Sequence, residues 1–347
     1  MKVLYFAHSV LNRGGDRMVL AHLGHLAASG HEVRIRANVV DTHFPVHPGI
    51  TIEKIRLPSP CGTIFSAIFA KPSTDRLIAT IMPTAFCLCL RNRNKVVYLA
   101  QEYEELGYGS RPARLLVRLM SHIGLNLFRI PTLAVSEQLG QWLRERFRTS
   151  VEIVPNGVDT KVFYPDSAHE LLTLKGSNRA ILLFARSDTR KGFDVAIKVV
   201  RKLQAEAKIP FDVWIIGEDT KADLSGLSSH FFGFLNDVQL RNVLSSTDVF
   251  LYPSRTDGFG LIVAEAFACK CPVVTTATVP IAEDEVNALV SKTGSVEDLA
   301  AKASRLLANK ELGSRLAEKG YDFIRGLSLQ AAASRFETFL MGMERSK

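Results

Sequence analysis

The sequence has 347 residues, of which 47% are hydrophobic and 22% charged, the balance expected of a folded protein with two domains of ordinary size. No apolar run reaches the roughly 20 residues that a membrane-spanning helix needs. The formal net charge of +8 suits an anionic partner such as a nucleotide or a phospholipid surface. The sequence lacks zinc-finger spacings, RNP-like aromatic segments and long Lys/Arg tracts, which argues against nucleic acid.

The beginning of the chain and its cysteines favour a cytoplasmic protein. The first residues, MKVLYFAHSVLNRGG, have no small-residue cleavage site and predict a buried strand rather than a signal peptide. The five cysteines are odd in number and lie in apolar sequence, which favours reduced, buried thiols over disulfides. Two C-x-C pairs could bind zinc only if both halves of the chain met there, so no metal site is expected.

Strand-like and helix-like patterns alternate through the first half. Strands are expected at 2–7, 31–38, 77–81, 96–100 and 132–135. The segment 16–29 carries apolar residues at helical spacing, and Gly30 follows it as a C-terminal cap. This β-α-β order predicts a parallel sheet with helices on both faces.

The second half repeats the same order. Strands are expected at 180–185, 211–216, 230–232, 249–252 and 272–275, and helices at 194–206, 237–244, 261–268 and 296–307. The turn-rich segment 154–165 between the halves indicates a domain boundary. We therefore predict two doubly wound, Rossmann-like domains, 1–155 and 156–328, with a last helix over about 329–347 that packs back on the first domain.

The segment 252–276, YPSRTDGFGLIVAEAFACKCPVVTT, is the strongest candidate site. A strand is followed by a glycine loop and a helix that begins near Leu261. Gly258 and Gly260 allow the backbone to approach a ligand closely, and the first N–H groups of the helix, at Leu261 and Ile262, favour a phosphate.

Two carboxylates flank the start of this helix. Asp257 and Glu265 could both accept hydrogen bonds from the hydroxyls of one bound sugar nucleotide. A plain βα turn with a surface Asp and a half-buried Glu is the alternative. Glu265 lies in the apolar string IVAEAFA, where an unpaired carboxylate is costly, and this favours a functional role.

A second candidate segment, 181–200, carries Arg186 and Lys191 around a loop that enters the next helix. Charge develops on the phosphates of a nucleoside diphosphate as its bond to a sugar breaks. An arginine fork and a lysine point charge at one strand end suit this charge. A solvated basic loop is the alternative for this segment taken alone.

Together the two segments resemble the signatures of family-4, GT-B-fold glycosyltransferases, R-x(4)-K-G and P-S-x-x-E-G-F-G-x-x-x-x-E-A. The segments VPNGVDTKVF and SSTDVFLYPS are similar to that family as well. The resemblance implies two Rossmann-like domains facing each other across a cleft. It also implies retaining, metal-independent transfer of a hexosyl or deoxyhexosyl group from a UDP-, GDP- or dTDP-sugar, with no other cofactor.

The resemblance also implies roles for individual residues. Arg186 and Lys191 hold the diphosphate, Asp257 the sugar hydroxyls and Glu265 the ribose. Backbone amides contact the sugar and phosphate, and they come from Gly258, Phe259, Gly260, Leu261 and Ile262.

Two departures from the family pattern leave alternatives open. Asp257 stands where the family usually has Glu, and the sequence after Thr276 lacks the common Gly-Gly. Because of these departures, a weakly active or non-catalytic sugar-nucleotide-binding subunit is an alternative hypothesis. A GT-B sugar-nucleotide epimerase is the third hypothesis, although it needs more acid–base groups than the sequence offers.

The first half matches the family weakly. In NRGGDR, Gly15 resembles the family's glycine loop beside the reaction centre, and an ordinary tight turn is an equal alternative. His22 and His25 are expected to be partly exposed helix residues rather than a metal pair. Glu102, in the segment AQEYEE, is the candidate for orienting or deprotonating an acceptor hydroxyl, with a solvated acidic loop as the alternative.

The segment 111–129 is apolar and basic at helical spacing. A core helix with one basic face is the favoured interpretation, and a helix on an anionic membrane the alternative. The apolar segment 64–70 is equally undecided. The expected acceptor is a glycan or a lipid-linked molecule of polysaccharide biosynthesis, and the expected location is the cytoplasm, with peripheral contact at the inner face of the membrane left open.

Overall fold

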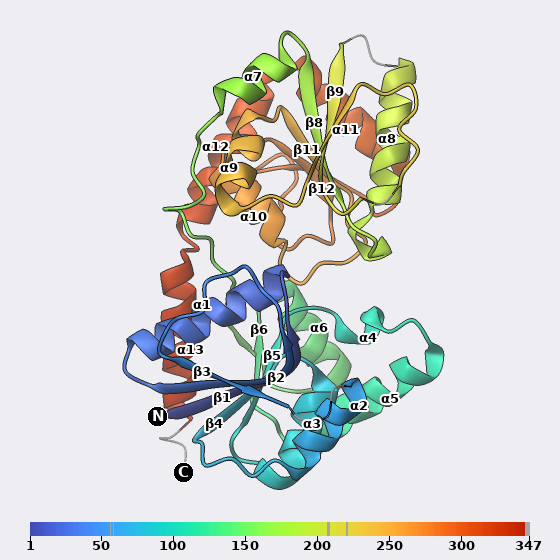
Figure 1. Ribbon diagram of the computed structural model, residues 1–347. Coiled ribbons are helices and arrows are strands. Elements are labelled where there is room, and N and C mark those ends of the chain that lie inside the picture. Colours follow the sequence, from blue (N-terminus) through green and yellow to red (C-terminus); the bar gives the residue numbers. More distant parts are fainter. Residues whose placement is uncertain (56, 58, 207–208, 220, 344–347) are drawn as a thin grey trace. The chain divides into compact units, whose positions relative to one another are not determined.

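The structure is a computed structural model that describes residues 1–55, 57, 59–206, 209–219 and 221–343 (Figure 1). Its contacts divide the chain into two compact units. Unit 1 contains Met1–Asn156 and Leu329–Lys347, and unit 2 contains Gly157–Ser328. The last residues of the expected C-terminal helix, 344–347, lie outside the described residues.

Unit 1 is built on a seven-stranded parallel sheet with the order β3-β2-β1-β4-β5-β6-β7. The strands are β1 (Lys2–Val10), β2 (Glu32–Val40), β3 (Ile50–Lys54), β4 (Arg76–Ala79), β5 (Val96–Ala100), β6 (Thr132–Ala134) and β7 (Glu152–Ile153). The strand order reverses at β1, which pairs with β2 on one side and with β4 on the other. Doubly wound sheets bind ligands at the carboxyl ends of the strands beside such a reversal.

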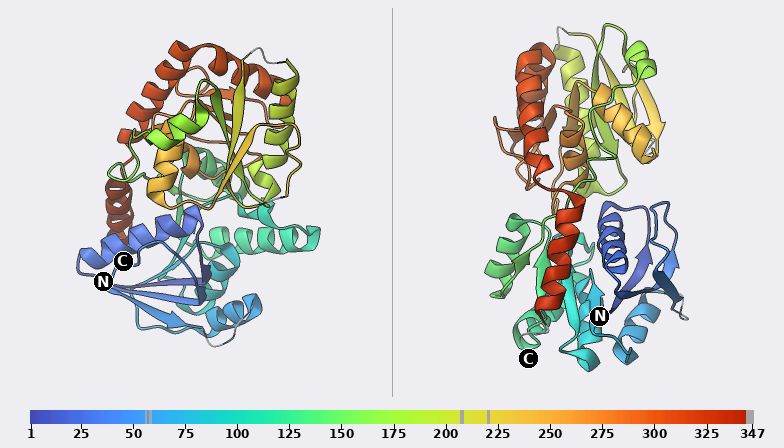
Figure 2. Two further views of the ribbon diagram at one scale, coloured as in Figure 1. Left: turned by 45° about the horizontal axis from the view of Figure 1, so that its top comes forward. Right: turned by 90° about the vertical axis from the view of Figure 1, so that its left-hand side faces the viewer.

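Helices cover both faces of this sheet (Figures 1 and 2). Right-handed crossovers place α1 on one face and α2, α3 and α5 on the other. Helix α13 packs against α1 and so shares its face. The helices of unit 1 are α1 (Gly14–Ala28), α2 (Pro60–Phe69), α3 (Met82–Asn92), α4 (Glu104–Gly107), α5 (Arg111–His122), α6 (Glu137–Phe147) and α13 (Leu329–Gly342).

Helix α13, which follows unit 2 in sequence, packs against α1 through a cluster of histidines. The ring of His22 stacks on Phe336 with 4.7 Å between centroids. The Glu337 carboxylate lies 2.9 Å from His25 Nε2 and 2.8 Å from His31 Nε2. The expectation of partly exposed histidines is therefore wrong for His22, which is buried because α13 covers it.

Unit 2 is a second doubly wound domain, on a six-stranded parallel sheet with the order β10-β9-β8-β11-β12-β13. The strands are β8 (Arg179–Ala185), β9 (Phe211–Gly217), β10 (Ser229–Gly233), β11 (Val249–Tyr252), β12 (Val273–Thr276) and β13 (Leu289–Ser291). The helices are α7 (His169–Lys175), α8 (Phe193–Glu206), α9 (Asp237–Ser246), α10 (Leu261–Ala268), α11 (Val296–Ala308) and α12 (Lys310–Arg325). The two parallel α/β domains predicted from the sequence are confirmed.

The segment 111–129 differs from the favoured core-helix prediction. Helix α5 ends at His122, and a π-helical turn, η1 (Ile123–Leu127), follows it. Leu115, Leu116 and Leu119 are 67%, 52% and 54% exposed, so these leucines are not core residues. Among the described helices, none is long and apolar enough to cross a bilayer.

The five cysteines are free thiols. Four of them, two in α3 and two in the connection between α10 and β12, are buried as expected. Cys61 is exposed at the start of α2, where the sequence had suggested a buried thiol.

Burial of His22 makes the stability of unit 1 depend on pH. Burial lowers the pKa of His22 to about 4, from 6.5. As the pH falls below 6.5 the unfolded chain takes up a proton that the folded chain refuses, so stability is lost between these two values. We expect His22→Phe to remove roughly 2 kcal/mol of the stability loss between about pH 7 and pH 5. Denaturant titrations at the two pH values measure it.

The control for this prediction is His169→Gln, which changes an exposed histidine at the start of α7. The control should retain the pH dependence of the unaltered protein. An unchanged pH dependence in His22→Phe would mean that His22 does not resist protonation in the folded state.

Candidate functional site

The two candidate segments of unit 2 meet at one edge of its sheet. Strands β8 and β11 pair in parallel, so their carboxyl ends lie side by side. The loop after β8 carries Arg186 and the short 3₁₀ turn η2 (Thr189–Lys191), and the loop after β11 carries Asp257 and leads into α10. Segments some 70 residues apart are thereby joined, as the sequence had suggested.

Hydrogen bonds fasten these two loops to each other. The Arg255 backbone N–H donates to the Arg190 carbonyl over 2.7 Å. The Arg255 guanidinium binds both carboxylate oxygens of Asp194, each at 2.7 Å. This fork-to-fork contact fixes the start of α8 against the β11 loop.

At the centre of the junction, Lys191 and Asp257 form an ion pair, with 3.1 Å between Nζ and Oδ2. Asp257 Oδ2 also accepts from the Tyr252 hydroxyl over 2.8 Å. Asp257 Oδ1 accepts from the backbone N–H groups of Phe259 at 3.2 Å and Gly260 at 2.9 Å. A carboxylate offers about four acceptor positions, and all four are engaged. The Asp257 carboxylate therefore has no free lone pair for the sugar hydroxyls that it was expected to bind.

The ion pair keeps both groups charged despite their burial. Burial by itself opposes ionisation of each, but the Asp257 carboxylate raises the pKa of Lys191 above its usual value. In turn the Lys191 ammonium and the Tyr252 hydroxyl hold the pKa of Asp257 below its usual value, although burial raises it. Lys191 is thus a fixed positive charge at this edge of the sheet.

Arg186 lies at the same edge and is less constrained. Its Nη1 is 3.2 Å from Glu218 Oε1, and its guanidinium lies over the Phe184 ring at 5.7 Å. The second oxygen of Glu218 accepts from the Ser187 N–H over 2.7 Å. Hydrogen bonding to the side chain and backbone of Ser187 lowers the pKa of Glu218. The side chain remains 24% exposed, so the guanidinium is accessible to an anion.

The start of α10 offers backbone donors. Gly260 has φ = 93°, and a Cβ there would lie 2.6 Å from Val279 Cγ1, so glycine is required. Within the described part of the chain, the N–H groups of Leu261 and Ile262 have no hydrogen-bond partner. With the positive end of the helix dipole they form a site for a phosphate.

The remaining predicted residues of this unit lie beside that helix start. Gly258 and Phe259 belong to the loop, and the Phe259 side chain is buried, which leaves only its backbone to a ligand. Glu265 is half-buried, one turn inside α10.

In unit 1, the two weaker candidate segments also meet. The Gln101 amide Nε2 donates to the Gly15 carbonyl over 2.9 Å. A Cβ on Gly15 would lie 2.5 Å from the Gln101 side-chain oxygen, so a larger residue would displace the end of that side chain. The glycine turn after β1 is thereby tied to the acidic loop after β5.

That acidic loop contains a titratable group that sequence reasoning missed. Glu102, the predicted acid–base residue, is exposed, whereas Glu104 is buried. Glu104 accepts from the Met82 N–H at 2.6 Å and from the hydroxyls of Tyr98 at 3.0 Å and Tyr108 at 3.1 Å. Burial raises the pKa of Glu104 to about 7, with these bonds opposing the rise. In the sequence, only the nearby tyrosines Tyr98 and Tyr108 could have indicated that Glu104 is buried and hydrogen-bonded.

Two Rossmann-like domains in one chain define the GT-B fold, and comparison with solved structures confirms it. Sucrose-phosphate synthase from Thermosynechococcus elongatus matches with a TM-score of 0.79 and 19% identity, over 100% of this chain and 99% of that one. Anabaena HepE, solved in complex with UDP and glucose, matches with a TM-score of 0.78 and 14% identity, over 99% of this chain and 100% of that one. At these identities the similarity shows a shared fold and nothing beyond it.

Sequence comparison adds a family for part of the chain. Residues 167–323, all in unit 2, match the family described as Glycosyl transferases group 1. D-inositol 3-phosphate glycosyltransferase from Segniliparus rotundus is 27% identical over 202 residues, 53% of this chain and 45% of that protein. The chain spans about half the length of the curated relatives it matches.

The junction of the two loops depends on Gly192. Gly192 has φ = 75°, and a Cβ there would overlap the Pro253 carbonyl oxygen. Gly226 has nearly the same φ, 78°, in open space. Gly226→Ala should cost about 1 kcal/mol of backbone strain, and Gly192→Ala at least about 2 kcal/mol more, because the β11 loop must shift. Urea denaturation of the two variants gives the comparison. Equal losses would show that the loops tolerate separation.

Proposed function

We propose that this protein is a retaining glycosyltransferase of family 4. It moves a hexosyl or deoxyhexosyl group from a nucleoside-diphosphate sugar to an acceptor hydroxyl in glycan or cell-surface polysaccharide biosynthesis. The observation that carries the proposal is the fixed charge of Lys191 beside the unpaired amides of α10, at one edge of a sheet. Arrangements of this kind bind diphosphates.

The donor diphosphate is bound by Arg186, Lys191 and the N–H groups of Leu261 and Ile262. The two cations take up the negative charge that grows on the leaving diphosphate, so the proposed transfer needs no metal ion or other cofactor. Asp257 acts through Lys191, whose ammonium it positions, rather than on the sugar itself. Glu265 is proposed for the nucleotide ribose, and the amides of Leu261 and Ile262 for sugar and phosphate, since those of Phe259 and Gly260 already bind Asp257.

A uridine donor is the first choice among UDP-, GDP- and dTDP-sugars. Support comes from Anabaena HepE, which shares the fold and was solved with UDP and glucose.

The acceptor side of the proposal concerns unit 1. Glu102 is proposed to orient or deprotonate the acceptor hydroxyl, and Gly15 to lie beside the reacting sugar. Glu104, with its pKa near neutrality, supports the same loop. The acceptor is proposed to be a glycan or a lipid-linked molecule, used in the cytoplasm at the inner face of a membrane.

A second candidate is a donor-binding subunit without catalytic activity. The observation that favours it is the complete use of the Asp257 oxygens within the loop. Such a protein would be stabilised by a sugar nucleotide yet neither transfer nor hydrolyse the sugar. Product analysis by mass spectrometry separates it from the transferase.

Substitution of the two cations tests the proposed donor site. Arg186→Ala and Lys191→Ala should each weaken UDP binding by about 10- to 100-fold, because each removes a charge-assisted hydrogen bond. Both should abolish transfer. A thermal-shift titration with UDP, GDP, dTDP and their sugars measures binding, since a ligand raises the apparent stability.

The control is Lys198→Ala, which removes an exposed cation from α8 in the same unit. Its binding should equal that of the unaltered protein. Undiminished UDP binding in both Arg186→Ala and Lys191→Ala, with the fold intact, would refute the donor site.

A further inference from the structure

The positive charge of the chain is concentrated in one stretch of unit 1. Residues 54–136 contain eleven Lys and Arg but only four Asp and Glu, which accounts for seven of the eight net charges. Within 106–136 there is no acidic residue. This stretch includes strands β4, β5 and β6 as well as α2, α3 and α5. Most of its cations lie outside the strands, and α3 packs against both α2 and α5 on one face of the sheet. We call the outer side of these three helices and η1 the α2–α3–α5 face.

Large apolar side chains are exposed on the same elements. They are Phe65 and Phe69 on α2, Leu90 on α3, Leu115, Leu116 and Leu119 on α5, and Leu127 in η1. A single exposed leucine needs no explanation, but a group of this size on neighbouring helices indicates an interaction surface.

The exposed side of helix α5 carries two stripes, one basic and one apolar. Arg111, Arg114 and Arg118, at i, i+3 and i+7, follow one line along the helix. The exposed leucines described above follow the adjacent line, while Val117 and Ser121 face the protein. An apolar stripe bordered by cations is the pattern of a helix that lies in a bilayer interface.

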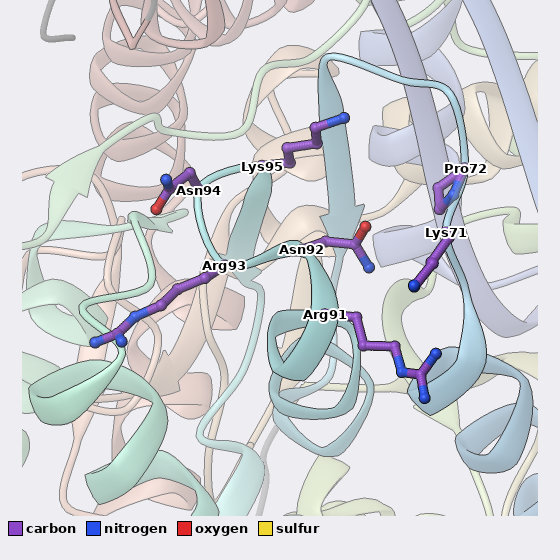
Figure 3. Close-up of a pocket in the computed structure, with 7 residues that line it drawn as sticks. All are labelled: Lys71, Pro72, Arg91, Asn92, Arg93, Asn94 and Lys95. Atoms are coloured by element: carbon purple, nitrogen blue, oxygen red, sulfur yellow. The ribbon is translucent and has the colours of Figure 1, made fainter.

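A basic pocket of about 400 Å³ lies at the ends of α2 and α3 (Figure 3). Its lining residues are Lys71, Pro72, Arg91, Asn92, Arg93, Asn94 and Lys95. Figure 3 shows the Lys71 and Arg91 side chains extending to the same side, and Arg93 to the other. No acidic side chain lines the pocket, and no ion pair joins its four cations to an acid among the residues described.

The pocket and the apolar side chains are one continuous feature. Arg91 lies over the Phe69 ring at 5.0 Å. On the other side, Arg93 lies over the Phe128 ring at 5.2 Å and donates to the Leu127 carbonyl. Cations therefore alternate with exposed aromatic and aliphatic groups from α2 to η1.

We propose that the α2–α3–α5 face docks on an anionic lipid bilayer. Its leucines and phenylalanines enter the interface, its arginines approach the lipid phosphates, and the basic pocket receives a phosphate headgroup. Anionic surfaces attract each nearby Lys or Arg, and the apolar side chains add burial. A second copy of this chain fits poorly, because a two-fold contact would bring the same cations together.

Vesicle sedimentation of the full chain, without any nucleotide, tests the proposal independently of the proposed sugar transfer. The protein should sediment with phosphatidylcholine vesicles that contain phosphatidylglycerol and stay in solution with phosphatidylcholine alone. High salt should release most of it, since exposed charges are screened.

Two double variants separate the apolar from the electrostatic contribution to vesicle binding. Leu115→Gln with Leu119→Gln removes apolar insertion, and Lys71→Glu with Arg91→Glu reverses the charge of the pocket. Each pair should lower the vesicle partition coefficient by at least about tenfold. The matched control is Lys319→Glu with Phe323→Gln, an exposed cation and an exposed aromatic residue on α12 of unit 2. The control should partition like the unaltered protein, and circular dichroism checks that each variant folds.

Three results would overturn the proposal. One is equal sedimentation with neutral and anionic vesicles. Another is undiminished binding in both folded double variants. The third is self-association in solution that Leu115→Gln with Leu119→Gln abolishes, which would assign the face to contacts between copies of this chain.

Discussion

The ion pair between Lys191 and Asp257 is the contact on which the candidate site depends. It joins the loops after two neighbouring strands, so the parallel pairing of β8 with β11 is a precondition for it. A buried charge is costly unless it is paired and hydrogen-bonded. Because Asp257 also binds two backbone N–H groups of its own loop, the same contact fixes the glycine turn that leads into α10.

This arrangement gives Asp257 a role different from that of a ligand-binding carboxylate. Its side chain is short, so its oxygens stay close to the loop and are used up there. A longer side chain at the same position would place its oxygens further from the loop amides. Asp in place of the Glu of the pattern that this sequence resembles therefore affects the distribution of hydrogen bonds within the loop, in addition to the reach toward a sugar.

The sequence predicted five of the six strands of unit 2, because they are apolar runs bounded by turn residues, but it missed helices α7 and α12. Helix α10 was predicted with its observed limits, 261–268, since the glycine loop that ends at Gly260 precedes it. The edge strands β3 and β13 were missed, as neither forms a continuous apolar run. Partners within the site were missed as well. Nothing local to Arg255 indicates that it binds Asp194, because that contact exists only once β8 and β11 are paired.

The pairing of charged residues likewise depends on the folded structure. A net charge of +8 suited a nucleotide as well as a phospholipid surface. The cations around the candidate donor site are largely balanced: Lys191 by Asp257, Arg186 by Glu218 and Arg255 by Asp194. The excess instead belongs to residues 54–136 of unit 1. Composition alone could not distinguish the two, because it counts charges without their partners. A donor site needs few charges in fixed positions, whereas a surface that meets a lipid layer needs many that remain unpaired. The two proposed sites would place one arrangement of each kind in different units of the chain.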